Sequence, residues 1–360
     1  MPPSPAYSSR EHSLRKAGDV MYKTSELDFV YGSTLVSSAG GKGTENERIS
    51  RLLDCRTAEA VLDAVCDSGI APDFERRAND SYSTTDALSD ALTSALDHAV
   101  SVVRAAAPVE GYYDMFFYKY DCNNVKSAIK ASVRRDAPGG CYFNCGTVSP
   151  ETIRHAVETR DFGCLPHHMS SAAANALETY ERTGEARCID FIIDRAYFED
   201  ISDAADRSDV PFFSEYVSAV ADVTNIRTSC RISRANLTAA ASASLFRRVF
   251  VPGGTVACEV FTERHDGGVP GLSGIADALP LSPLQAAVKN AAEANDPELL
   301  DAYVAGTAKA VSGAAFSPEK PAVFLLMREE EIRRYRRAAV LISGGDFDRL
   351  KSRLEVKLYG

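Results

Sequence analysis

The stretch that decides the fold is Asp121-Cys122-Asn123-Asn124-Val125-Lys126-Ser127-Ala128-Ile129-Lys130. Apolar residues recur in and around it at steps of three or four positions: Met115, Tyr118, Cys122, Val125 and Ile129. Because an α-helix has about 3.6 residues per turn, this spacing places them on one face of a helix. We therefore expect an amphipathic helix from roughly Asp114 to Asp136.

The same pattern returns 101 residues later (222 − 121 = 101), at Asp222-Val223-Thr224-Asn225-Ile226-Arg227-Thr228-Ser229-Cys230-Arg231. The shared form is Asp-x-x-Asn-(Val/Ile)-(Lys/Arg)-x-x-x-(Lys/Arg). A weaker third copy begins at Glu331 (331 − 222 = 109) and keeps the acid, the large apolar residue and the base, but lacks the Asn. Three copies of one helix predict a repeat protein.

A second marker recurs with nearly the same period. Asp97, Asp194 and Asp301 each follow a Leu or Ile and each precede one copy of the repeated helix (194 − 97 = 97; 301 − 194 = 107). A period of about 100 residues is longer than that of tetratricopeptide or armadillo repeats. Three related helical domains therefore fit better than a fine solenoid. The expected division is a flexible tail at 1–26 and repeats at 27–137, 138–234 and 235–360.

Signals for helix starts occur along the whole chain, whereas strand signals are scarce. Thr57 and Ser83 are placed as N-caps, and Ser149-Pro150 and Ser282-Pro283 combine a cap with a proline in the first turn. Pro138-Gly139-Gly140 should end the first repeated helix. Period-two alternation is nowhere sustained and Ala is abundant. The sequence predicts an all-α fold.

Composition excludes several classes of protein. The chain has 360 residues, of which 45% are hydrophobic and 25% are charged, as in ordinary globular proteins with a large core. A net charge of −10 argues against a general nucleic-acid binder. No apolar run approaches the roughly 18 residues of a membrane span, and the Pro-rich start lacks the apolar segment of a signal peptide. Nine scattered cysteines are best explained as reduced thiols, so we expect a cytoplasmic protein.

Catalytic and nucleotide-binding motifs find little support. Gly40-Gly41-Lys42-Gly43-Thr44 suggests a phosphate loop, but that motif needs Gly at 36 and Ser or Thr at 43. Those positions hold Val36 and Gly43, so a flexible loop is the better interpretation and we expect no bound nucleotide. There is no Gly-x-Ser-x-Gly elbow for a nucleophile. We expect no catalytic residue and no cofactor.

One short stretch of the sequence contains residues that could bind a metal ion. Cys141, Cys145, Cys164 and His167 lie close together in sequence, with His168 next to the last. Zinc binds such residues, but Cys141-x3-Cys145 lacks the tight spacing of a zinc knuckle. Core thiols with a pair of loop histidines are the favoured interpretation, and a metal-dependent helical enzyme stays open as an alternative.

The repeated helix also carries a basic stripe beside its apolar face. It consists of Lys126, Lys130 and Arg134 in the first copy and of Arg227 and Arg231 in the second. Such a stripe is often a solvated face. Its recurrence in an acidic chain favours contact with an acidic partner or with neighbouring acidic helices. For Asp121 and Asp222, we expect a structural role in orienting or capping the helix.

At these repeats the sequence resembles the C subunit of bacterial and archaeal V/A-type ATPases, the family that includes eukaryotic subunit d. Further matches carry the resemblance: Asp28-Phe29-Val30-Tyr31, Leu52-Leu53, Ala58 to Leu62, Ile189-Asp190, Asp194 to Phe198, and Glu331-Ile332 with Arg336. Their order and spacing extend over about 28–345, nearly the whole chain.

The resemblance implies an all-helical funnel of three similar domains with pseudo-threefold symmetry. Such a subunit lies between the rotating central shaft and the membrane proteolipid ring, on the cytoplasmic side, and passes torque without catalytic residues. Its expected partners are the shaft subunits and the ring. The choice between H⁺ and Na⁺ belongs to the ring. The alternative that the repeats alone leave open is a soluble helical scaffold for another acidic partner.

Overall fold

The computed structural model describes residues 24–76, 83–134, 142–235, 237–262, 268–313, 315–348 and 350, with the side chain of Arg134 outside this part. These residues form fifteen α-helices and no β-strand. The all-α prediction is confirmed. Most of the predicted tail at 1–26 lies outside the described residues.

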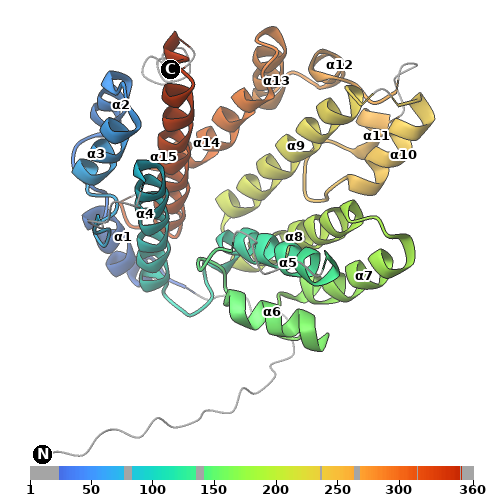
Figure 1. The fold of residues 1–360 in the computed structure, drawn as a ribbon, viewed down its shortest axis with the longest axis horizontal. Coiled ribbons are helices and arrows are strands. Elements are labelled where there is room, and N and C mark those ends of the chain that lie inside the picture. The colour runs from blue at the N-terminus through green and yellow to red at the C-terminus, as the bar shows by residue number, and fades with distance from the viewer. Residues whose placement is uncertain are drawn as a thin grey trace, which may run out of the picture.

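The first and last parts of the chain lie together (Figure 1). The N-terminal helices are α1 (Val30–Ser38), α2 (Glu45–Asp54), α3 (Ala58–Ser68) and α4 (Thr84–Ala106), preceded by the 3-10 turn η1 (Glu26–Phe29). The last helix, α15 (Glu319–Ser343), runs beside α4 and contacts α1 and α3 as well. Segments about 300 residues apart in sequence thus form one group of helices.

Two further groups complete the molecule (Figure 1). One consists of α5 (Tyr118–Arg134), α6 (Pro150–Thr159), α7 (His167–Thr183) and α8 (Arg187–Ser208), with η2 (Asp114–Phe116) before it. The other consists of α9 (Pro211–Ser233), α10 (Ala239–Val249), α11 (Cys258–Thr262), α12 (Leu272–Ala278), α13 (Pro283–Glu293), η3 (Pro297–Leu300) and α14 (Asp301–Ala310). The three copies of the repeated helix are therefore α5, α9 and α15, which we call the repeat helices.

The predicted helix starts are confirmed by their capping bonds. Thr57 accepts a hydrogen bond from the amide of Ala60, and Ser83 accepts one from Asp86. Ser149 and Ser282 accept in the same way, and each is followed by a proline in the first turn. A side chain that satisfies a free amide of the first turn stabilises a helix by about 1 kcal/mol.

One predicted boundary is wrong in detail. The helix expected from Asp114 begins only at Tyr118, because residues 114–116 form the separate 3-10 turn η2. Short 3-10 turns of this kind are frequent where a longer helix begins.

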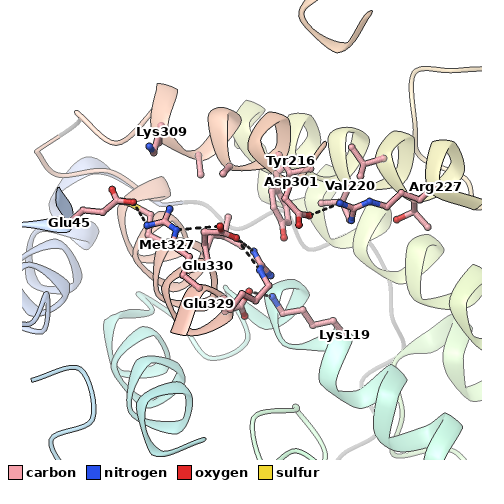
Figure 2. A pocket seen from close by; sticks show the side chains of 18 of the residues that line it. Glu45, Lys119, Tyr216, Val220, Arg227, Asp301, Lys309, Met327, Glu329 and Glu330 are labelled. Carbon is pink, nitrogen blue, oxygen red and sulfur yellow. Dashed lines mark hydrogen bonds and ion pairs between the residues drawn. The ribbon is translucent and has the colours of Figure 1, made fainter. Parts of the chain in front are cut away.

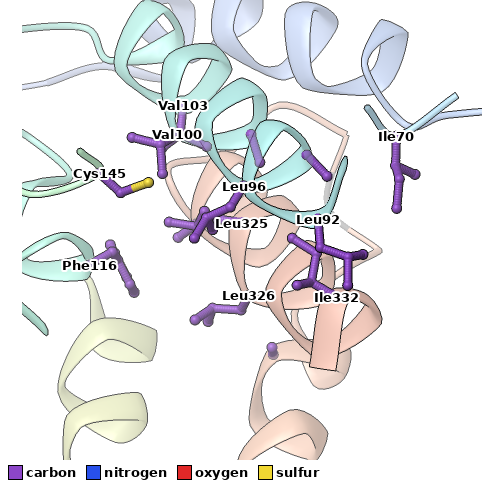
Figure 3. Packing of buried hydrophobic residues seen from close by; sticks show 14 of the residues in the cluster. Ile70, Leu92, Leu96, Val100, Val103, Phe116, Cys145, Leu325, Leu326 and Ile332 are labelled. Carbon is purple, nitrogen blue, oxygen red and sulfur yellow. The ribbon is translucent and has the colours of Figure 1, made fainter. Parts of the chain in front are cut away.

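The hydrophobic core is divided into clusters that the repeat helices connect. The largest cluster joins η1, α2–α4, η2 and α15 to the first half of α9, and in Figure 3 Leu325 and Ile332 of α15 lie beside Leu96 and Leu92 of α4. A second cluster joins the rest of α5 to α6–α8, and a third joins the rest of α9 to α10–α13 and η3. Each of α5 and α9 thus runs from the shared core out into its own cluster.

No helix within the described residues is both long enough and apolar enough to cross a membrane.

Candidate functional site

The acid and the Asn of the first repeat helix hold the loop that follows it. Asp121 is fully buried and accepts hydrogen bonds from the amide and hydroxyl of Thr147, at 2.9 and 2.7 Å, and from the amide of Val148 at 3.1 Å. Asn124 pairs with both backbone groups of Phe143, at 2.8 and 2.9 Å. We call this arrangement the loop clamp.

The second repeat helix has the same clamp. Asp222 accepts hydrogen bonds from the Thr255 hydroxyl at 2.6 Å and from the Val256 amide at 2.9 Å. Asn225 pairs with both backbone groups of Val251, at 2.9 and 3.0 Å. The acid and the Asn therefore have the structural role that was expected of the acid, but they orient the following loop rather than cap their own helix.

The clamped loops share a sequence of their own. Gly146-Thr147-Val148 and Gly254-Thr255-Val256 lie at equivalent places in the two copies. A Cβ atom added at Gly146 would overlap Oδ1 of Asp121, and one at Gly254 would overlap Oδ1 of Asp222. Glycine is needed there because the carboxylate lies directly against the backbone. This short repeat was a signal in the sequence that the motif analysis missed.

In the third repeat helix, ion pairs take the place of the loop clamp. Glu331 accepts hydrogen bonds from Arg48 at 2.5 Å and from Arg328 at 3.0 Å. These two guanidinium groups donate in turn to backbone carbonyls of residues 39–43. The loop Gly40-Gly41-Lys42-Gly43-Thr44 is therefore tied to α15, and it follows helix α1 rather than the strand that precedes a phosphate loop.

The basic stripe on α5 lies against α8. Lys126 pairs with Asp194 at 2.6 Å and Lys130 with Asp190 at 2.5 Å. This is the contact with neighbouring acidic helices that the sequence left open beside an external partner. Asp194 is one of the three acids, Asp97, Asp194 and Asp301, that recur about every 100 residues in the sequence. Its recurring spacing from the repeat helix thus corresponds to an ion pair between α8 and α5.

The first residue of the basic stripe on α9 also pairs with an acid of a neighbouring helix. Arg227 pairs with Asp301 at 3.0 Å, and Arg337 of α15 shares that carboxylate at 2.9 Å. Arg231 donates to Thr228 one turn earlier. The side chain of Arg134 lies outside the described residues. A role of the stripe in binding a partner stays a prediction.

The possible metal window is dispersed. Cys145 is buried and donates to Asp97 at 3.0 Å, Cys164 is exposed, and Cys141 lies outside the described residues. His168, beside His167, lies 2.9 Å from Asp203. Where the chain is described, no group of three or more His, Cys, Asp or Glu side chains is arranged to hold a metal ion.

One cavity lies where all three repeat helices meet. It has a volume of about 230 Å³ and is lined by residues of α2, α5, α8, α9, α14 and α15 (Figure 2). Val220, Ala305 and Leu326 are among the residues that give it an apolar wall. We call it the central cavity.

Most charged residues of the central cavity are paired, some of them between different helices. Glu329 of α15 accepts from Lys119 of α5 at 2.5 Å and also from the Tyr120 hydroxyl. Glu330 pairs with Arg333 at 2.9 Å. Because a buried charge is costly unless it is paired, the contacts of Glu329 fix α15 against α5, whereas the Glu330–Arg333 pair lies within α15. Nothing in the sequence pattern singled out this run of acids.

Two tyrosines face the central cavity between the charged pairs. Burial, followed by nearby acidic groups that include Glu329, raises the pKa of Tyr197 and of Tyr216 well above the ordinary value. Both hydroxyls therefore stay neutral and can donate a hydrogen bond at physiological pH. With paired charges, neutral hydroxyls and an apolar wall, the cavity is suited to receiving groups of another protein.

The comparison with known families finds one match, and it spans most of the chain. A family model described as the ATP synthase (C/AC39) subunit matches residues 33–353, which include all three repeat helices. Among curated proteins, none matches the chain.

Proposed function

The chain belongs to the ATP synthase (C/AC39) subunit family, and we propose that it is a non-catalytic central-stalk subunit of a V/A-type ATPase. In this role it couples the rotating shaft to the membrane proteolipid ring during H⁺ or Na⁺ transport. It lies on the cytoplasmic side and reaches the membrane only through the other subunits. Its partners are the shaft subunits and the ring.

The observation that carries this proposal is the position of the central cavity. A coupling subunit needs a seat near the axis about which the shaft turns, and the central cavity is lined by all three repeat helices. Most of its charged residues are paired with one another, so a seated shaft segment would cover these pairs without separating them. Packed helical units resist deformation, as the transmission of torque requires.

The proposal includes a pseudo-threefold funnel of three units. The equivalent clamps on α5 and α9, and the ion pairs of α15 at the same position, support it. The repeats proposed at 27–137, 138–234 and 235–360 put each repeat helix at the end of a unit. The cores favour a variant in which each repeat helix begins a unit, so that α15 shares its unit with α1–α4.

Co-purification tests the function. A tagged full-length chain should recover both the shaft subunits and the proteolipid from gently solubilised membranes, at constant ratios. A chain that ran free of both would contradict the coupling role. Recovery of an unrelated acidic protein instead would favour the scaffold function.

A further inference from the structure

Helix α2 is weakly built into the core. Only Ile49 and Leu52 of its ten residues are buried. A helix of this length is marginal without tertiary contacts. The contacts that hold α2 in place therefore decide whether the segment 39–54, which contains α2 and the preceding glycine loop, stays closed.

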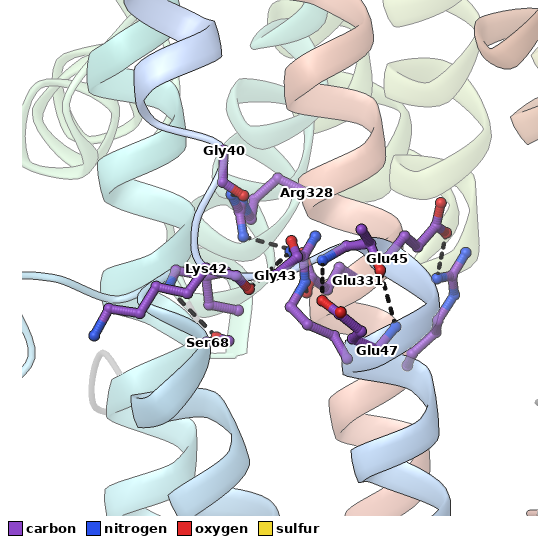
Figure 4. Close-up of polar contacts among 12 residues, drawn as sticks. Gly40, Lys42, Gly43, Glu45, Glu47, Ser68, Arg328 and Glu331 are labelled. Carbon is purple, nitrogen blue, oxygen red and sulfur yellow. Dashed lines mark hydrogen bonds and ion pairs between the residues drawn. The ribbon is translucent and has the colours of Figure 1, made fainter.

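Ion pairs join this segment to α15 (Figure 4). Arg48 lies 2.5 Å from Glu331, and Glu45 lies 2.6 Å from Arg334. Arg328 completes the group by pairing with Glu331 at 3.0 Å while donating to the carbonyl of Gly40, also at 3.0 Å. We call these five side chains the latch.

The latch differs from the loop clamps in a way that matters for opening. In the first two copies, neutral amide and hydroxyl donors hold a loop that directly follows its own repeat helix. In the third copy, the loop comes from the other end of the chain, and Arg48 and Glu331 are 283 positions apart. If the ion pairs break, the segment stays linked to α1 and α3 at its two ends, and the Lys42 amide still donates to the Ser68 carbonyl at 2.7 Å, so the opening is local.

A second cavity lies directly beside the latch. It has a volume of about 180 Å³, and its lining includes Phe324 and Arg328. Glu45, Met327 and Arg334 line both this lateral cavity and the central cavity. The first turn of α2 is therefore part of the wall between the two cavities.

We propose that residues 39–54 form a flap that the latch holds shut over the side of the central cavity. When the latch opens, α2 leaves α15 and the lateral and central cavities become continuous. Helix α15 stays on α4, because their interface is an apolar core that includes Leu92, Leu96 and Ile332 (Figure 3). Opening of the flap requires no other subunit. It can therefore be tested on the isolated chain, whether or not the proposed function is correct.

Hydrogen exchange on the full chain tests the flap. In the wild type, amides of α2 should exchange more than about tenfold faster than amides of α4, through a local opening. Raising NaCl from about 0.1 M to about 1 M should widen that ratio, because screening weakens ion pairs that open into solvent. Equal exchange of the two helices at both salt concentrations would overturn the proposal.

Two variants with similar burial on the same helix test whether the latch controls the exchange of α2. Glu331→Gln leaves Arg48 and Arg328 without their shared carboxylate, and it should speed exchange of α2 by at least about tenfold while leaving α4 unchanged. Glu329→Gln, two residues away on the same helix and equally buried, pairs with α5 and should leave α2 exchange unchanged. Equal acceleration of α2 and α4 in Glu331→Gln, or the same effect in both variants, would show that no separate flap exists.

Discussion

A buried carboxylate leaves no room for a side chain at Gly146. Asp121 sits in the core with its oxygens held by Thr147 and Val148, and Gly146 lies against it. Burial raises the pKa of Asp121, and the hydrogen bonds from Thr147 and Val148 partly offset that rise. The sequence indicated the structural role of Asp121. Its partners could not be predicted, because they belong to a loop about 25 residues further on.

Replacing Gly146 by alanine should therefore destabilise the protein. The added methyl group would overlap a carboxylate that its hydrogen bonds prevent from moving, and the free energy of unfolding should fall by about 1–3 kcal/mol. Chemical denaturation measures it. Gly306→Ala is the control, since its Cβ would meet no atom within 4 Å and it lies inside α14, where alanine should be neutral or slightly stabilising. Equal stabilities of the two variants would refute the clamp as a tightly packed contact.

His168 should make stability depend on pH. Partial burial acts to lower its pKa, but the hydrogen bond to Asp203 and the charges of Asp200, Asp203 and Glu199 outweigh burial, so the pKa lies above 6.5. A folded-state pKa above the unfolded value means that the stabilisation is complete below about pH 6.5 and is lost as the pH rises through the folded-state pKa.

Urea denaturation of wild type and His168→Asn across this range measures the effect. The wild type should be the more stable below about pH 6.5, and the difference should shrink at higher pH. His167→Asn, which changes the exposed neighbour, serves as the control. A difference between wild type and His168→Asn that did not vary with pH would rule out the ion pair as its source.

At the scale of elements, the local signals in the sequence predicted the helices well. Capping residues and prolines placed the starts of α3, α4, α6 and α13 correctly, because those interactions are local. The error falls at η2, whose first turn has no side-chain cap that the sequence could have shown.

The pairing of α5 with α8 through the basic stripe gives a prediction at this scale. Lys126→Glu would face Asp194, and we expect the free energy of unfolding to fall by about 1–2 kcal/mol while helicity is retained. Adding Asp194→Lys should restore part of the loss. Circular dichroism and denaturant melts measure both.

The Lys126→Glu variant also tests whether the basic stripe pairs helices within the chain or binds a partner. If Lys126→Glu weakened binding to the ATPase subunits and left the stability of the chain unchanged, the stripe would be a partner surface and the helix pairing would contribute little. A combined reversal of Lys126 and Arg227 should show the larger loss of assembly, since each residue stands at the same position of its repeat.

At the scale of the whole molecule, the repeat was visible in the sequence but the site was not. The markers at Asp121, Asp222 and Glu331 reported three equivalent helices. The central cavity could not be predicted, because six helices from α2 to α15 line it and no local pattern links them. The latch could not be predicted either, because its residues come from opposite ends of the sequence and no local pattern links them.

The central claim is that the central cavity seats the shaft and thereby couples it to the ring. Ala305→Trp would fill the cavity from α14 without touching an ion pair, whereas Ala302→Trp places the same bulk on the exposed face of that helix. ATP hydrolysis and ion transport should be measured together in membranes that contain each variant. We expect Ala302→Trp to retain both activities and Ala305→Trp to lose ATP-driven transport, although its thermal stability and the hydrolysis by the detached motor persist. Normal transport with Ala305→Trp would contradict the claim.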